Sequence, residues 1–112
     1  MDDMGVLHVG TTVTGKLLLD NSASDEADLL LAYGRVDGTS NSDSRKVAPG
    51  GAGTVKQALD MRGRVEILVN MAAQADSGTL IVSENGKEKD RKAIVGDVIW
   101  VYTVVAAPVP TP

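Results

Sequence analysis

Hydrophobic and polar residues alternate through much of this chain, which is the pattern of β-strands that bury one face. The alternation is clearest over residues 64–71, RVEILVNM. The apolar side chains fall on one side of this segment: Val65, Ile67, Val69 and Met71. The polar side chains fall on the other: Arg64, Glu66 and Asn70. We therefore expect a strand with one face in a core and one face in solvent.

Residues 11–20, TTVTGKLLLD, follow the same pattern. Val13, Leu17 and Leu19 share the predicted inner face, and Gly15 marks either a bulge or a point of close approach. Residues 97–105, DVIWVYTVV, are apolar on both faces and rich in β-branched residues. This second pattern predicts a central strand that is covered on both sides, with Trp100 in the core.

A hairpin is predicted over residues 79–92, TLIVSENGKEKDRK, because Asn85-Gly86 suits the two positive-φ positions of a type I′ turn. The turn pairs Glu84 with Lys87. Continuing that register places Val82 opposite Lys89 and Leu80 opposite Arg91. A return strand that carries so many charges fits the edge of a sheet, where charges prevent pairing with other chains.

Two further segments fit either a short helix or a strand. Residues 24–34 have Ser24 as a helix N-cap and Gly34 past the end, or form a strand with Leu30 and Ala32 inward. Residues 54–63 have Thr54 and Gly63 in the same roles, or form a strand with one apolar face, made of Val55, Leu59 and Met61. We favour strands for both segments.

Seven or eight short strands at a spacing of about ten residues predict an all-β fold, an antiparallel β-sandwich with immunoglobulin-like or jelly-roll-like connections. The 112 residues suffice for one domain, which we place at residues 1–105 with an N-terminal arm at 1–10. Residues 48–53, APGGAG, read as a loop. Residues 106–112 form a proline-rich C-terminal tail of polyproline character.

Composition narrows the function classes. Lys and Arg total 11 against 15 acids, so the basic patch of a nucleic-acid-binding protein is not expected. Phe is absent and Trp occurs once, which disfavours stacking on bases or sugars. With no Cys, there is no thiol chemistry. The acidic start and the lack of a long apolar run predict synthesis in the cytoplasm without a signal peptide and no membrane insertion.

The loop DGTSNSDS over residues 37–44 imitates the start of a calcium-binding loop, with Asp37, Asn41 and Asp43 as candidate metal ligands. The imitation fails at the sixth position, which is Ser42 where Gly is needed, and at the twelfth, which is Ala48 where a bidentate Glu is needed. The acidic loop DNSASDEAD over residues 20–28 also lacks the twelfth-position Glu. Turn formation by Asp, Asn and Ser explains both loops better, so we predict no metal or other cofactor.

Catalytic groups are scarce. His8 is the one histidine and is expected to be a side chain on a strand face rather than a general base. No G-x-S-x-G motif accompanies the serines, and PGGAGTVK lacks the G-K-[ST] ending of a phosphate-binding loop. The acidic pairs Asp2-Asp3 and Asp25-Glu26 are expected to be solvated. The sequence therefore predicts that the protein is not an enzyme.

The leading hypothesis is a structural or assembly protein that acts by packing against copies of itself or a larger protein scaffold. A small virion subunit (phage capsid, decoration or tail) or a surface-layer subunit is the class we expect. Pro108, Pro110 and Pro112 are the predicted partner contacts, because a polyproline tail suits a groove on a neighbour. The alternative is a ligand-binding β-sandwich module for calcium or a polar carbohydrate. An enzyme of unrecognised type ranks third.

Overall fold

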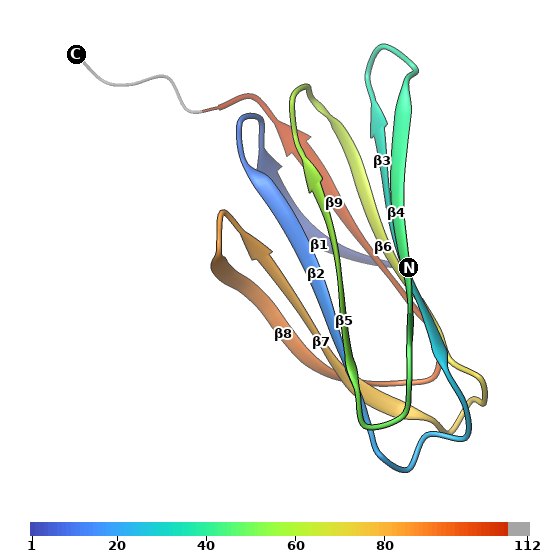
Figure 1. The fold of residues 1–112 in the computed structure, drawn as a ribbon. Coiled ribbons are helices and arrows are strands. Elements are labelled where there is room, and N and C mark those ends of the chain that lie inside the picture. Colours follow the sequence, from blue (N-terminus) through green and yellow to red (C-terminus); the bar gives the residue numbers. More distant parts are fainter. Residues whose placement is uncertain (108–112) are drawn as a thin grey trace.

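The computed structural model describes residues 1–107 and shows an all-β protein in two layers (Figure 1). The described residues form nine strands, listed in chain order: β1 (Asp2–His8), β2 (Thr12–Leu19), β3 (Ala27–Arg35), β4 (Ser40–Val47), β5 (Ala52–Ala58), β6 (Gly63–Asn70), β7 (Ser77–Glu84), β8 (Lys87–Val95) and β9 (Val98–Val105). The predicted β-sandwich is confirmed. Its strand number exceeds the expected seven or eight, because β1 and β4 carry little of the alternation that reveals a strand.

The strands form two sheets. Sheet A has the order β1-β9-β6-β3-β4, and sheet B has the order β5-β2-β7-β8. Neighbouring strands are antiparallel except for β1 and β9, which pair in parallel. Most of the segment that the sequence suggested as an arm, residues 1–10, is therefore an edge strand of the chain's own sheet. The predicted tail contacts Pro108, Pro110 and Pro112 lie outside the described residues.

The core lies between the inner faces of the two sheets, because each strand interior to a sheet turns every second side chain inward. The predicted inner faces of β2 and β6 are confirmed, since Val13, Leu17 and Leu19 are buried and so are Val65, Ile67 and Val69. Trp100 is 2% exposed and is a core residue, as predicted. Gly15 marks a close approach rather than a bulge: a Cβ there would lie 3.4 Å from Ile67 Cδ1 of the opposite sheet.

The two ambiguous segments are strands, as favoured. The inward face predicted for residues 24–34 is wrong, because Leu29, Leu31 and Tyr33 are buried while Leu30 and Ala32 point outward. With apolar residues on both faces of LLLAY, alternation could not select the inner one. In the second segment the strand ends at Ala58; Val55 and Leu59 are buried, and Met61 lies in the following connection.

The hairpin turn is confirmed, with φ of 50° at Asn85 and 79° at Gly86, and Glu84 pairs with Lys87. The register beyond Ser83 is wrong by one residue. Val82 lies opposite Asp90 rather than Lys89, and Leu80 opposite Lys92 rather than Arg91. A β-bulge accounts for the shift, because one extra residue, Lys89, is inserted between the partners of Ser83 and Val82. β8 is an edge strand, as expected.

Candidate functional site

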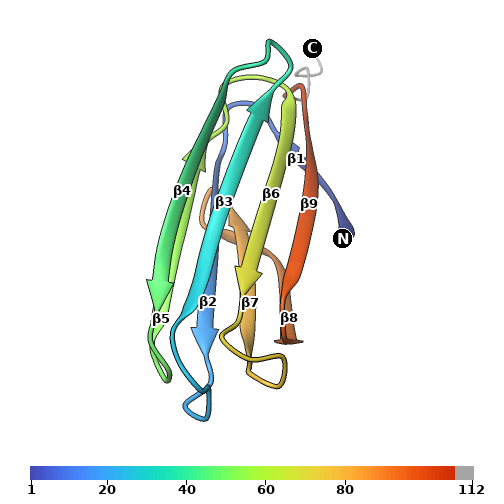
Figure 2. The same cartoon turned by 90° about the vertical axis from the view of Figure 1, so that its right-hand side faces the viewer.

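The outer face of sheet A carries apolar side chains that no described segment covers. Strand β9 was expected to be covered on both faces, but only its inner face, with Trp100, Tyr102 and Val104, is buried. Figure 2 looks onto the outer face, with β3, β6 and β9 in front. The partly exposed apolar residues there form what we call the outer patch: Leu30, Ala32, Leu68, Ile99 and Val101.

Strand register makes the outer patch continuous across three strands. Leu30 of β3 lies opposite Leu68 of β6, and Leu68 lies opposite Ile99 of β9. One step along the strands, Ala32 and Val101 flank Glu66. Directly opposed side chains on one sheet face contact each other, so these residues present one surface rather than isolated apolar points.

Two shallow depressions lie on the outer face, and each includes a residue of the outer patch in its lining. A shallow depression of about 350 Å³ lies over β3, β4 and β6, and its lining includes Ala32, Gly34, Ser40 and Ser42. A second depression of about 440 Å³ lies further along the same strands, with Leu30 and Ser44 in its lining. These hollows give the face relief into which protruding side chains of another protein would fit.

Charged side chains on the outer face form two pairs of opposite sign, of which one lies at the border of the outer patch and the other includes Glu66, between Ala32 and Val101. Arg64 Nη2 lies 3.0 Å from Glu66 Oε1, and Lys46 Nζ lies 3.1 Å from Asp28 Oδ1. Both pairs are largely exposed, so each contributes little to folding stability. The outer face therefore combines aliphatic side chains with one ion pair among them and one beside them.

Three of the four edge strands, β4, β5 and β8, are protected against pairing with other chains. β8 reads KEKDRK along most of its length, and such charges oppose strand addition. On the other side of the sandwich, the Asp43 carboxylate of β4 accepts a hydrogen bond of 2.9 Å from the Lys56 N–H of β5. That contact joins the edge strands of the two sheets. Face packing is therefore the more accessible mode of association.

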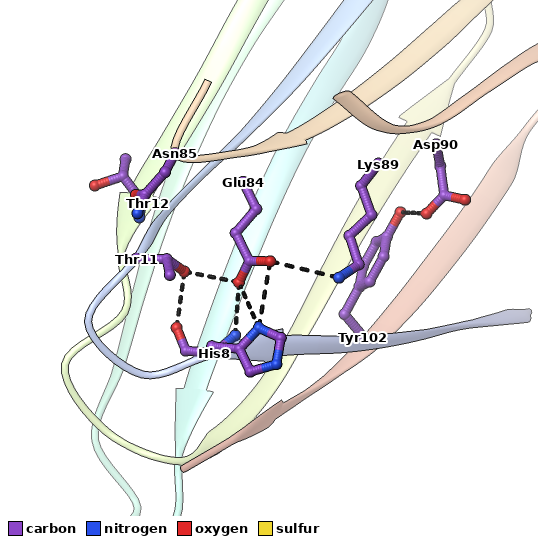
Figure 3. A network of polar contacts seen from close by, with 8 residues as sticks. All are labelled: His8, Thr11, Thr12, Glu84, Asn85, Lys89, Asp90 and Tyr102. Carbon is purple, nitrogen blue, oxygen red and sulfur yellow. Dashed lines mark hydrogen bonds and ion pairs between the residues drawn. The ribbon is translucent and has the colours of Figure 1, made fainter. Parts of the chain in front are cut away.

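A cluster of polar residues joins the end of β1 to the β7–β8 hairpin (Figure 3). Glu84 Oε2 accepts a hydrogen bond from the His8 main-chain N–H at 2.7 Å and lies 3.1 Å from His8 Nδ1. The Thr11 hydroxyl is 2.9 Å from Oε2, and Lys89 Nζ is 3.4 Å from Oε1. We call these four residues the Glu84 cluster. In this cluster the Glu84 carboxylate accepts a hydrogen bond from the His8 main-chain N–H, which points away from β9 and would otherwise lack a partner on the edge of β1.

The contacts lower the pKa of Glu84. Burial disfavours the carboxylate and raises the pKa, but hydrogen bonds from the His8 N–H, the Thr11 hydroxyl and the His8 ring outweigh it, and the Lys89 charge adds to them. The pKa of Glu84 therefore lies below the ordinary value for a glutamate. Glu84 is therefore an anion at neutral pH that holds the two sheets together through its donors.

A second polar contact joins the sheets beside the Glu84 cluster. The Tyr102 hydroxyl of β9 donates a hydrogen bond of 2.7 Å to Asp90 Oδ2 of β8. Burial raises the pKa of Tyr102, and the Asp90 carboxylate raises it further, so the phenol remains protonated and keeps its donor role. The Lys89 bulge makes this contact possible, because it places Asp90 opposite the inward residue Val82.

The Glu84 cluster lacks the arrangement of a catalytic triad. A His–carboxylate pair activates a nucleophile that is aimed at a substrate. The hydroxyl in this cluster, that of Thr11, lies 2.7 Å from the His8 carbonyl and 2.9 Å from Glu84, so it has two protein acceptors for its single proton. His8 was expected on a strand face, and it is the last residue of β1. Its partner Glu84 lies 76 positions away, and no sequence signal linked them.

The candidate calcium ligands are not brought together as a site. Asp37 lies in the β3–β4 turn and accepts hydrogen bonds from the N–H and hydroxyl of Thr39. Asn41 and Asp43 belong to β4, and Asp43 is bonded to Lys56. The two acidic loops lie at opposite ends of β3 (Figure 2). Among residues 1–107, no group of three or more His, Cys, Asp or Glu side chains has the geometry to hold a metal ion.

The aromatic side chains all belong to the core. One Trp and two Tyr are the aromatic residues of the chain, and Trp100, Tyr33 and Tyr102 are each 2% exposed or less. The stacking surface on which a carbohydrate-binding module depends is therefore not presented by them. Within the described part of the chain there is also no helix of the length and apolarity needed to cross a membrane.

Comparison of the chain with family models, with curated proteins and with solved structures gave no match.

Proposed function

We propose that this protein is a non-enzymatic structural subunit that assembles by packing the outer face of sheet A against other copies of itself, alone or on a larger protein scaffold. The observation that carries the proposal is the outer patch. Two-layer sandwiches bury the inner faces of their sheets and expose polar side chains outward. Here β3, β6 and β9 place aliphatic residues at the centre of an outer face instead.

The size of the face suits a specific interface. Sheet A has five strands, and β6 at its centre has eight residues. Strand spacings of about 4.8 Å and a rise of about 3.3 Å per residue give a face of roughly 600 Å². Two such faces would bury about 1,200 Å², which is the lower limit for stable protein–protein interfaces. The protected sheet edges favour this mode over edge-to-edge pairing.

A virion component, either a capsid, decoration or tail protein, or a surface-layer subunit is the class of assembly that we propose. Three observations support it: the outer patch suits packing on neighbours, the aromatic residues are all in the core, and the Glu84 cluster uses its polar groups to join the two sheets. The alternative, a module for calcium or a polar carbohydrate, has less support, because its candidate ligands are engaged in turn and strand contacts.

Paired substitutions test the proposed interface. Leu68→Glu places a charge at the centre of the outer patch, whereas Ile81→Glu places the same charge on the outer face of sheet B, between Lys16 and Arg91. Both positions are partly exposed on interior strands, so each variant is expected to fold. In sedimentation velocity, Leu68→Glu should abolish the oligomer and Ile81→Glu should retain it. An oligomer that tolerates Leu68→Glu, with both melting temperatures near the parent's, would refute the interface.

A further inference from the structure

Strand β1 is attached to the domain less firmly than any strand interior to a sheet. Of its seven residues only Leu7 is buried. It pairs with a single neighbour, β9, and a register shift between Asp3 and Gly5 interrupts the pairing.

We propose that β1 is exchanged between copies, so that residues 2–8 of one chain pair with β9 of a second copy of the same chain. This inference rests on the proposed assembly and names its partner. Exchange of an identical element is a low-cost route to an oligomer, because the contacts made in the closed chain are remade between chains. In the closed chain Leu7 is buried in the core and β1 has a defined register along β9, and an exchanged β1 would use the same core position and the same register in the second copy.

The connection after β1 fits the role of a hinge. Residues 9–11 join β1 to β2, and Gly10 has φ of 91°, in the left-handed region. Short connections of this kind favour exchange, because opening the turn lets β1 continue in the direction of β2 and reach a neighbour. The Glu84 cluster lies at this hinge, where His8 and Thr11 contact Glu84. The His8 contacts with Glu84 would be remade between chains, because His8 belongs to the exchanged strand. The Thr11 hydroxyl belongs to the hinge, and its hydrogen bonds to the His8 carbonyl and to Glu84 hold the turn closed, so their loss should favour the open form.

The position of β1 makes a second copy the natural recipient. β9 contributes Ile99 and Val101 to the outer patch. Along the edge that faces away from β6, it pairs with β1. Two copies that pack their outer patches therefore also bring β1 and β9 near the shared boundary. The remaining edge strands are occupied or charged, since β4 and β5 are joined through Asp43 and Lys56 and β8 carries its row of charges. Strand donation thus has one acceptor in the fold, β9.

Engineered cysteines distinguish a closed from an exchanged β1. Val6 of β1 lies directly opposite Thr103 of β9, both side chains are exposed, and the chain has no native cysteine. In the oligomer formed by Val6→Cys/Thr103→Cys, oxidation should yield a covalent dimer on a non-reducing gel. As a second arm, Val6→Cys chains and Thr103→Cys chains are refolded together, and exchange is indicated when the mixed disulfide between them exceeds the crosslinking that each single variant shows with itself across the packed faces. Each single variant alone supplies the background of random crosslinks.

The outcomes separate this inference from the proposed function. An oligomer whose oxidised double variant stays at monomer mass, with the mixed disulfide at background, would overturn strand exchange and leave assembly intact. A protein that remains monomeric by light scattering, with an intrachain disulfide, would overturn both. Thr11→Val, which removes the hydroxyl contacts of the closed hinge, should raise the covalent-dimer fraction severalfold, whereas Glu88→Gln, an exposed acid paired with Arg91, should leave it unchanged.

Discussion

At the scale of single residues, Glu84 has the clearest structural role. Its carboxylate collects donors from β1, the β1–β2 turn and β8, and thereby joins the two sheets at one side of the sandwich. Hydrogen bonds to a charged acceptor are among the stronger ones in proteins, and a partly buried acceptor that loses its charge leaves its donors poorly satisfied. Glu84 therefore contributes to the stability of the whole domain although it lies at a strand end.

Glu84→Gln should lower the free energy of unfolding by about 1–3 kcal/mol, because the amide has a single acceptor oxygen and no charge for His8 and Lys89. Urea denaturation measures the change. The matched control is Glu88→Gln, which removes a charge from an exposed pair and should cost no more than about 0.5 kcal/mol. Equal effects of the two substitutions would show that the Glu84 contacts add nothing beyond a surface ion pair.

The same residue predicts a dependence on pH. The pKa of Glu84 is lower in the folded protein than its ordinary value of 4.5, so the folded state binds this proton less readily than the unfolded state. Its stabilisation is thus complete above the unfolded pKa and disappears as pH falls through the folded pKa. The stability difference between the parent and Glu84→Gln should shrink below about pH 4, where an undiminished difference would contradict the assignment.

At the scale of the strand and the turn, sequence pattern predicted the strands with one clear apolar face and missed the others. β2 and β6 alternate and were placed with the correct inner residues. β1 and β4 each bury a single residue, Leu7 and Val47, so their sequences have no period to detect. The Lys89 bulge shifts the register of β8 by one residue. The sequence did not predict this shift, because an inserted residue cannot be recognised in a stretch where nearly every residue is charged.

Only part of the candidate site could be predicted from the sequence. The apolar second face of β9 was visible, and its interpretation as a covered face was wrong for the chain alone. The Glu84 cluster was out of reach, because it depends on a contact between residues 8 and 84 that only the folded topology creates. A lone histidine and a glutamate beside a turn have no shared spacing from which their contact could be predicted.

The β7–β8 turn gives a prediction at this scale. Asn85 has φ of 50°, and its side-chain oxygen accepts a hydrogen bond of 2.8 Å from the Thr12 N–H. Asn85→Ala should destabilise the protein by about 1–2 kcal/mol, since alanine is strained at positive φ and lacks the acceptor. Asn85→Gly lacks only the acceptor and should cost less in thermal denaturation. A glycine variant that is as unstable as the alanine variant would assign the whole effect to the Thr12 contact.

At the scale of the whole molecule, the fold leaves its faces rather than its edges open to partners. The sandwich is joined on one side by Asp43 with Lys56, and on the other by the Glu84 cluster and by Tyr102 with Asp90. A net charge of -4 keeps separate molecules apart in general, so association requires a specific surface. We propose that the outer patch on sheet A is that surface and that β1 links copies across it.

The most direct test is the molar mass of the unmodified chain in solution, measured by light scattering across a range of concentrations at near-physiological salt. We predict a defined species at a multiple of 11.7 kDa, and dilution should return it toward 11.7 kDa only slowly if strands are exchanged. A mass of 11.7 kDa at every concentration, from a protein that melts cooperatively, would contradict the claim that this sandwich is built to assemble.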